Sequence, residues 1–340
     1  MITRRHPDVS RLRRARAWLL PLLFLCAFPA VVPAQPPSGA RDYVELLPLQ
    51  PTKTETIQFE SKLAGRVLPY KVVLPPYYEL GVRTRRRYPV LFLLHGFGGS
   101  HADWLSKSKL AEYAAEHRMI VVTPEGANGW YTDSAGVASD KFESYIVEEL
   151  IADVARRFRT IEAREGRAVA GLSMGGYGAL KFGVKHPEKF VLAASMSGAV
   201  GAASWRSEDD LPGAWPALRR SLTQTFGPAD GPAKASNDLF KLLRELAPGR
   251  TSALPFLYLD CGTEDELGLL AANRNLADLL VARKIPHEYR QLPGRHNWDY
   301  WDRQVREVLR LAERTMTPAR AEAARRPPGR FRASRAEAAR

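Results

Sequence analysis

The feature that most constrains this chain of 340 residues is a Gly-x-Ser-x-Gly sequence at residues 171–175. An apolar run with strand character precedes it, and a helical pattern with small residues in its first turns follows it. We therefore expect a sharp turn from a strand into a helix, with Ser173 in a strained backbone conformation and its oxygen exposed at the carboxyl edge of a sheet. The alternative is a tight glycine turn that exposes a serine without chemical use.

Short apolar runs alternate with amphipathic stretches along the body of the chain, which is the pattern of a βα-alternating sheet. The inner runs are apolar throughout, as expected where helices cover both faces of a sheet. One such sheet often forms a single large domain, so we predict an α/β fold with a mostly parallel central sheet of about eight strands. The expected strands are residues 54–60, 70–74, 90–94, 120–123, 168–171, 192–197, 255–260 and 287–292, and the expected helices are 109–117, 144–158, 177–186, 237–245, 271–283 and 300–314.

Residues 54–316 are expected to form this domain, and residues 198–250 within it differ in composition. They are richer in Pro, Gly, Ser and charged residues than the sequence around them. Such a stretch predicts an excursion above the sheet. It forms either part of a cap or wall over a binding site, or a surface insertion with no role in binding.

The first 34 residues have the order of a secretory signal peptide: six arginines, then an apolar run at 18–28, then small residues up to Ala34. The apolar run is shorter than the roughly 20 residues needed to span a bilayer and is flanked and interrupted by prolines. We therefore predict cleavage after Ala34, a linker at 35–53, and a secreted or periplasmic protein without stable membrane insertion. Cys26 would also allow a lipoprotein signal, and an arginine pair leaves both Sec and twin-arginine export open.

The net charge of +13 is concentrated at the two ends of the sequence. The signal segment and the tail at residues 317–340 each contribute five positive charges, which leaves only about +3 for the body. The tail contains mainly Ala, Arg, Pro and Gly and is expected to be disordered and solvated. Contact of this tail with an anionic envelope surface is the alternative, and no nucleic-acid partner is expected.

A second glycine-rich turn follows the buried run at 90–94, with the sequence His-Gly-Phe-Gly-Gly at 95–99. A turn of this kind after a central strand can direct free backbone N–H groups into a cleft. Two donors around an oxyanion contribute about 3 kcal/mol each to transition-state stability. We predict the N–H of Phe97 and the N–H of Met174, at the start of the helix after Ser173, as these donors, and His95 as a hydrogen-bonded residue that shapes the loop.

Four ordered motifs resemble the esterase D family of α/β-hydrolases: Leu-His-Gly-Phe-Gly-Gly at 94–99, Gly-Leu-Ser-Met-Gly-Gly at 171–176, Asp-Cys-Gly-Thr-Glu-Asp at 260–265 and Gly-Arg-His-Asn-Trp at 294–298. The resemblance extends over residues 70–311. The family includes S-formylglutathione hydrolases, tributyrin esterases, feruloyl and acetyl xylan esterases, and antigen 85 mycolyltransferases. The motifs specify the family and the α/β-hydrolase fold, but they do not specify the substrate.

This resemblance implies a catalytic triad in the chain order Ser, acid, His, with no metal and no other cofactor. Ser173 would attack an acyl carbonyl, His296 would take its proton and pass it to the leaving group, and a carboxylate would hold the imidazole tautomer. His296 is preferred because it follows the last strand in a loop that can reach across the sheet edge. The competing histidines are His101, His117, His186 and His287, of which His117 and His186 lie near predicted helix ends.

The acid must be chosen among four neighbouring carboxylates. We select Asp265, because the acid of this fold lies in the loop beyond the strand and the family's Gly-x-x-Asp pattern falls on 262–265. Asp260, at the expected end of the strand, is the alternative. Once Cys26 is removed with the signal peptide, Cys261, which lies between Asp260 and Asp265, has no partner for a disulfide and is interpreted as a small buried thiol. The four carboxylates are Asp260, Glu264, Asp265 and Glu266.

Aromatic residues near these motifs are candidates for a substrate pocket. Trp130 and Trp298 are the preferred ones; Tyr131, Tyr300 and Trp301 are comparable candidates, and the cluster at 298–301 is equally compatible with packing at the base of a helix. The expected partner is a small-molecule or polysaccharide-linked ester, and the sequence does not indicate an oligomeric state.

The predicted function is that of an exported serine esterase that hydrolyses short-chain or aryl esters of the acetyl or feruloyl type. An acyltransferase of the mycolyltransferase type, in which a sugar or lipid hydroxyl replaces water, is the alternative within the same fold. A formylglutathione thioesterase is disfavoured because that substrate is cytosolic. A non-catalytic envelope-binding protein of this fold is a further alternative, but it predicts a broken triad, whereas each expected member is present.

Overall fold

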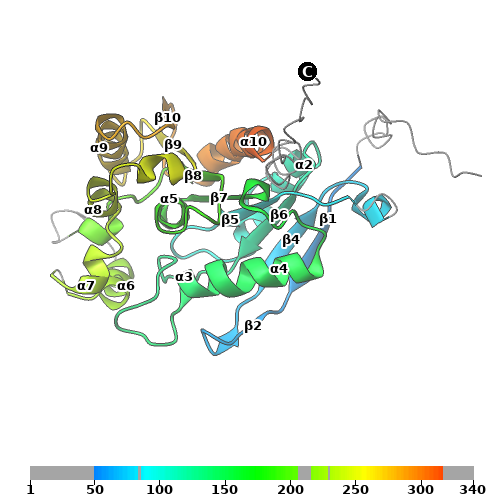
Figure 1. The fold of residues 1–340 in the computed structure, drawn as a ribbon, viewed down its shortest axis with the longest axis horizontal. Coiled ribbons are helices and arrows are strands. Elements are labelled where there is room, and N and C mark those ends of the chain that lie inside the picture. Colours follow the sequence, from blue (N-terminus) through cyan, green and yellow to red (C-terminus); the bar gives the residue numbers. More distant parts are fainter. Residues whose placement is uncertain (1–49, 83–85, 206–215, 229, 317–340) are drawn as a thin grey trace, which may run out of the picture. The chain divides into compact units, whose positions relative to one another are not determined.

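Eight strands form one twisted sheet in the order β1-β4-β6-β5-β7-β8-β9-β10 (Figure 1). The computed structural model describes residues 50–82, 86–205, 216–228 and 230–316. Neighbouring strands from β6 to β10 are parallel, and only β1 and β4 run antiparallel to their neighbours. This confirms the predicted, mostly parallel sheet. The strands are β1 (Lys53–Ile57), β4 (Tyr70–Leu74), β5 (Val90–Leu94), β6 (Ile120–Pro124), β7 (Arg167–Leu172), β8 (Leu192–Met196), β9 (Phe256–Gly262) and β10 (His287–Leu292).

The strands at the centre of the sheet are those with uninterrupted apolar sequences. Each residue of β5, β6 and β8 is buried, because helices cover both faces of the sheet at this position. Alternate residues of β5 therefore contact different layers: Val90, Phe92 and Leu94 belong to one hydrophobic core, whereas Leu91 and Leu93 belong to the other.

Helices cover both faces of the sheet, as predicted (Figure 1). One core is closed by the helical run from α3 to α4 together with α5, α8 and α9, and the other by α1, α2 and α10. The helices are α1 (Asp103–Ser106), α2 (Leu110–Ala114), α3 (Phe142–Ser144), the π-helical η3 (Tyr145–Leu150), α4 (Ile151–Arg157), α5 (Met174–Lys185), α6 (Pro216–Phe226), α7 (Pro232–Ala235), α8 (Leu239–Arg244), α9 (Leu269–Ala282) and α10 (Trp298–Thr315), with short 3-10 turns at η2 (Tyr78–Val82), η4 (Arg164–Gly166), η5 (Ala202–Ser204) and η7 (Arg250–Ala253).

The first predicted strand is too long. The prediction ran to residue 60, but β1 ends at Ile57, and the chain then pairs with itself in a short ribbon of β2 (Glu60–Ser61) and β3 (Arg66–Val67). Gly65, with a φ of +62°, permits this reversal. Residues 60–61 therefore pair with the nearby residues 66–67, and β1 does not extend further along β4.

The helix after Ser173 begins at Met174, three residues earlier than predicted, so Ser173 occupies its N-cap position. Small residues allow this early start. A Cβ atom on Gly175 would lie 2.6 Å from the carbonyl oxygens of Leu94 and His95, so the first turn of α5 contacts the end of β5 backbone to backbone. This contact brings the two glycine-rich turns of the sequence together.

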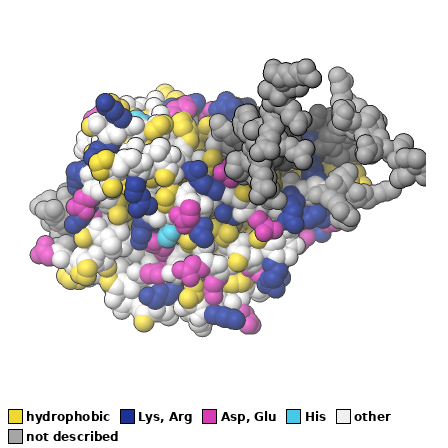
Figure 2. Space-filling model, viewed as in Figure 1, with side chains coloured by type: hydrophobic (Ala, Val, Ile, Leu, Met, Phe, Trp, Pro, Cys, Tyr) yellow, Lys and Arg dark blue, Asp and Glu magenta, His cyan; other side chains and the backbone are white. Residues whose placement is uncertain are grey.

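The body of the protein has a mixed surface charge, as its composition predicts. Basic and acidic side chains are interspersed over the face shown in Figure 2. The predicted signal peptide 1–34, the tail 317–340 and most of the linker 35–53 lie outside the described residues, so these boundaries remain predictions.

We predict that Gly175→Ala destabilises the protein strongly. The new methyl group would meet backbone carbonyls that cannot rotate away, and overpacking of this kind costs about 3 kcal/mol at its upper range. Gly65→Ala is the matched control, because its Cβ would meet no atom within 4 Å and only the left-handed backbone would cost about 1 kcal/mol. Urea unfolding of both variants measures the difference, and an equal or smaller loss in Gly175→Ala would contradict the close backbone contact.

Candidate active site

Ser173 lies at the turn between β7 and α5 with a φ of +52° and a ψ of −116°, which is a strained conformation for a residue with a side chain. Its backbone is fixed by hydrogen bonds at both ends. The N–H of Ser173 donates to the carbonyl of Met196 at 2.9 Å, and its own carbonyl accepts from the N–H groups of Tyr177 and Ala199, each at 3.0 Å. The sharp turn expected from the sequence is present, and the serine side chain is partly exposed at the carboxyl edge of the sheet.

His296 lies in the loop between β10 and α10, and its Nε2 is 3.0 Å from the Oγ of Ser173. The edge of the imidazole meets the ring of Trp301, with centroids 4.9 Å apart. The loop packs closely against the end of β9. A Cβ atom on Gly262 would lie only 2.3 Å from the carbonyl oxygen of Gly294, so this contact requires glycine at position 262. The remaining histidines considered from the sequence, His101, His117, His186 and His287, bond to other groups.

Asp265 is the carboxylate that contacts His296. Its Oδ2 is 2.8 Å from Nδ1 of the imidazole, and its Oδ1 accepts the N–H of Leu267 at 3.1 Å. The Asp265 side chain is fully buried. A neighbour that the sequence analysis did not assign, Glu266, accepts the backbone N–H of His296 at 3.1 Å and so helps to fix the loop.

Asp260, the alternative acid, points to a different partner. Its Oδ1 accepts the hydroxyl of Tyr300 at 2.8 Å, and its Oδ2 has no hydrogen-bond partner among the described residues. Burial raises the pKa of the Asp260 carboxyl to about 7, although the Tyr300 hydroxyl donates to it.

Cys261 is also buried. Burial raises the pKa of its thiol, and the negative charges of the nearby carboxylates raise it further. The thiol is therefore held in its neutral, unreactive form.

The two predicted backbone donors lie at the same place in the fold. Phe97 lines a cavity together with Ser173, and Met174 is the next residue after the serine. Within the described part of the chain, neither the N–H of Phe97 nor that of Met174 donates a hydrogen bond. The turn at 95–99 is fixed by a residue that the sequence did not reveal, because Asn128 Oδ1 accepts the N–H of Gly98 at 2.7 Å.

His95 is buried and spans the base of this turn. Its Nε2 accepts the N–H of Gly126 at 2.9 Å, so the proton is on Nδ1, which lies 2.8 Å from the carbonyl of Gly96. The neighbouring Glu125 loses hydration on burial, but its hydrogen bonds with His101 and with the N–H of Ala127 outweigh this and hold its pKa well below the usual range. His95 has the loop-shaping arrangement expected from the sequence.

A cavity of about 600 Å³ opens beside Ser173 and His296, with aromatic side chains in its walls. Trp130 and Trp298 both line it, together with three aromatic residues, Phe97, Trp205 and Trp301. Tyr131 and Tyr300 are instead buried, with their hydroxyls bonded to the carbonyl of His95 and to Asp260.

Residues from the 198–250 stretch also contribute to the cavity. Trp205 and Leu218 lie in its wall, and sequence reasoning missed both because no motif marks them. At the rim, Lys107 forms an ion pair with Asp103 at 2.7 Å and lies 5.6 Å from the centre of the Trp298 ring.

In the described ranges there is no group of three or more His, Cys, Asp and Glu side chains arranged to hold a metal ion. A search of the same ranges for a helix with the length and apolar character of a membrane span finds none.

The sheet order, the strand-turn-helix at Ser173 and the helices on both faces define the class as α/β-hydrolase. Within this class the chain belongs to the Esterase family, described as "Putative esterase", which matches residues 61–311. The protein is an enzyme, a carboxylic ester hydrolase.

Three similar proteins illustrate this membership. An acetyl esterase from Caldicellulosiruptor saccharolyticus is 30% identical over 216 residues, which cover 63% of this chain and 79% of that protein. Esterase Rv1288 from Mycobacterium tuberculosis is 32% identical over 258 residues, which cover 70% of this chain and only 54% of that protein. The solved structure of a ferulic acid esterase is 26% identical, with a TM-score of 0.65, and the match covers 78% of this chain and 99% of that one.

We predict that Asp260→Asn changes the pH dependence of stability. The carboxyl has a pKa of about 7 when folded and about 3.9 when unfolded. Between these values the folded state holds the extra proton, so the free energy of unfolding of the wild type falls as pH rises through this window. Asn keeps an acceptor for Tyr300 without this titration. Urea unfolding from pH 4 to 8 should show the wild type losing stability relative to the variant up to about pH 7, whereas parallel curves would mean that Asp260 is ionised throughout.

Proposed function

We propose that Ser173, His296 and Asp265 form a catalytic triad, and that the protein hydrolyses carboxylic esters through a covalent acyl-serine. The observation that supports this most is the continuous chain of contacts from Ser173 Oγ to His296 Nε2 at 3.0 Å and from His296 Nδ1 to Asp265 Oδ2 at 2.8 Å. This chain opens on a cavity large enough for an ester of moderate size.

In the proposed reaction, Ser173 Oγ attacks the carbonyl carbon of the ester while His296 Nε2 takes its proton. Asp265 keeps the other imidazole proton on Nδ1 and stabilises the imidazolium that forms. The oxyanion accepts hydrogen bonds from the N–H groups of Phe97 and Met174. The imidazolium then protonates the leaving alcohol. A water molecule attacks the acyl-serine while His296 takes its proton, and the imidazolium returns that proton to Ser173 Oγ as the acid is released.

The proposed substrates are esters with aryl or short acyl groups, of the feruloyl or acetyl type. Aromatic rings from Phe97, Trp130, Trp205, Trp298 and Trp301 surround the cavity, and such rings favour a planar aryl group through stacking and edge contacts. The likeness to a ferulic acid esterase and to an acetyl esterase supports the same substrate classes.

Transfer of the acyl group to a sugar or lipid hydroxyl is the alternative outcome of the same acyl-serine. Product analysis with a chromogenic ester, with and without a polyol acceptor, separates the two: free acid in both reactions supports hydrolysis, and a new ester supports transfer.

Export is also part of this proposal. The basic, apolar and small-residue order of residues 1–34 supports a signal peptide cleaved after Ala34. Amino-terminal sequencing of the mature protein tests it: a mature chain that begins at Gln35 supports cleavage, and a retained Met1 contradicts it.

A fluorophosphonate probe should label Ser173 in the folded protein, because His296 activates this hydroxyl. Ser173→Ala should lose the label and reduce kcat by roughly 10⁴-fold or more, whereas Ser252→Ala, at an exposed serine outside the cavity, should behave as the wild type.

Asp265→Asn should lower kcat by about 10³ to 10⁴-fold, since the imidazole tautomer is no longer fixed. Asp260→Asn is its matched control and should keep turnover near that of the wild type; normal turnover in Asp265→Asn would exclude the proposed acid.

Trp298→Ala should weaken the use of aryl esters. Loss of one aromatic contact raises KM for methyl ferulate by about five-fold, while 4-nitrophenyl acetate, with its small acyl group, changes less. Leu267→Ala removes a non-aromatic residue that also lines the cavity and provides the control. Steady-state kinetics of both variants with both esters measure the effect, and equal changes in the two variants would argue against an aryl site at Trp298.

A further inference from the structure

Two consecutive residues, of which the first lines the cavity, have left-handed backbones. Trp130 has a φ of +53° and Tyr131 a φ of +51°, and neither is glycine. Conformations of this kind are costly for residues with side chains and persist only where surrounding contacts determine them. Some element of the structure must therefore hold this turn in place.

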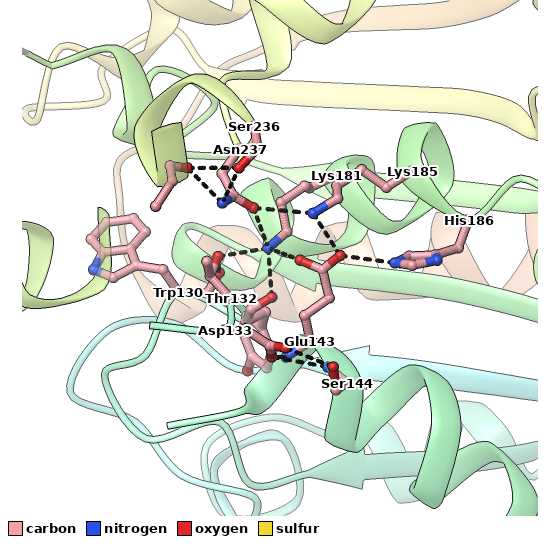
Figure 3. A network of polar contacts seen from close by, with 12 residues as sticks. Trp130, Thr132, Asp133, Glu143, Ser144, Lys181, Lys185, His186, Ser236 and Asn237 are labelled. Carbon is pink, nitrogen blue, oxygen red and sulfur yellow. Dashed lines mark hydrogen bonds and ion pairs between the residues drawn. The ribbon is translucent and has the colours of Figure 1, made fainter. Parts of the chain in front are cut away.

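Lys181 supplies these contacts from α5, two turns beyond Ser173. Its side chain is fully buried, and its Nζ donates to the carbonyl of Tyr131 at 2.7 Å and to Thr132 Oγ1 at 2.6 Å (Figure 3). Thr132 Oγ1 in turn donates to the carbonyl of Trp130 at 2.9 Å. One ammonium group thus fixes the carbonyls of both left-handed residues, directly or through one hydroxyl.

The charge of Lys181 is balanced by Glu143, whose Oε2 is 2.8 Å away. The other oxygen of Glu143 contacts Lys185 Nζ at 2.7 Å and His186 Nε2 at 2.9 Å, on the side away from the loop (Figure 3). Burial lowers the pKa of Lys181 to about 8, even though Glu143 opposes this shift. A buried charge is costly to the fold, so packing alone does not account for a lysine at this position.

The loop that Lys181 holds connects two parts of the site. Trp130 lines the cavity, and its ring, which is almost fully buried, has its centroid 6.2 Å from that of Phe97 and 6.1 Å from that of Trp205. Two residues earlier, Asn128 Oδ1 accepts the N–H of Gly98, next to Phe97. The loop therefore supports both the aromatic wall and the turn that presents the Phe97 N–H.

We propose that Lys181 is a positioning residue for substrate selection: by binding the Tyr131 carbonyl and Thr132 it keeps the strained turn closed and the Trp130 ring packed in the aromatic wall of the cavity that receives the aryl acyl group. This rests on the proposed function, in which an aryl acyl group occupies the cavity. Lys181 itself does not line the cavity and acts through the loop.

The test compares Lys181→Met with Lys185→Met. Both lysines pair with Glu143, but only Lys181 bonds to the loop. We expect KM for methyl ferulate to rise about ten-fold in Lys181→Met because the aromatic wall is misplaced, with a much smaller change for 4-nitrophenyl acetate. Lys185→Met should keep the wild-type ratio between the two esters. An equal loss with both esters, or equal behaviour of the two variants, would overturn the proposal.

A second pair of variants applies where Lys181→Met fails to fold because Glu143 is left without its buried partner. Glu143→Gln keeps Lys181 on the loop, whereas Glu143→Gln with Lys181→Met removes both charges and the loop contacts together. The selective rise in KM is expected only in the double variant, and an unchanged ratio between the esters there would overturn the role of Lys181.

Binding of free ferulate separates this proposal from the proposed function, since it requires no turnover. Fluorescence titration should give a dissociation constant about ten-fold higher in Lys181→Met than in Lys185→Met. A wild type that binds ferulate but neither hydrolyses esters nor reacts with the fluorophosphonate would contradict the triad alone. Equal dissociation constants in the two variants would contradict the role of Lys181 alone.

Discussion

The backbone of Ser173 is the constraint on which the rest of the site depends. A non-glycine residue at a φ of +52° costs roughly 1–3 kcal/mol, and that cost is offset by hydrogen bonds to Met196, Tyr177 and Ala199. The strain has a geometric result, since it turns the chain from β7 into α5 within one residue and leaves the side chain at the sheet edge. Gly175 then allows the first turn of α5 to contact the end of β5, so the turn at 95–99 lies beside the serine.

The parallel sheet supplies the other parts at the same edge. Because parallel strands present their carboxyl ends together, the loops after β9 and β10 meet beside the loop after β7. Gly262, at the end of β9, lies against the backbone of Gly294, in the loop after β10. A side chain at Gly262 would meet the carbonyl oxygen of Gly294, so glycine is what allows this close contact. His296 and Asp265 thus approach each other through backbone packing, and Glu266 adds a bond to the His296 N–H.

The sequence predicted those features whose causes are local. The turn at 171–175 and the eight strands follow from glycine spacing and apolar runs. The proximity of Ser173, Asp265 and His296 is not local, and it was implied only by the resemblance of four ordered motifs to a known family. The predicted end of the first strand, at residue 60, was wrong because the local β2–β3 hairpin competes with a longer β1. Lys181 and Trp205 could not be identified in advance, because a lysine in a helix is ordinarily exposed and no motif marks Trp205 as a residue of the cavity.

The position of Lys181 has a physical explanation in the loop that it binds. Among the described residues no backbone N–H donates to the carbonyl of Trp130 or Tyr131, so these buried carbonyls depend on side-chain donors. The ring of Tyr131 packs on α5 at Gly178, where a Cβ atom would lie 2.7 Å away, and the Tyr131 carbonyl accepts a hydrogen bond from Lys181, one turn further along the helix. Lysine provides that length and more than one donor, but its charge then requires Glu143. The same helix therefore contacts Ser173 through the N–H of Tyr177 in its first turn and the 130–132 loop through Lys181 in its third.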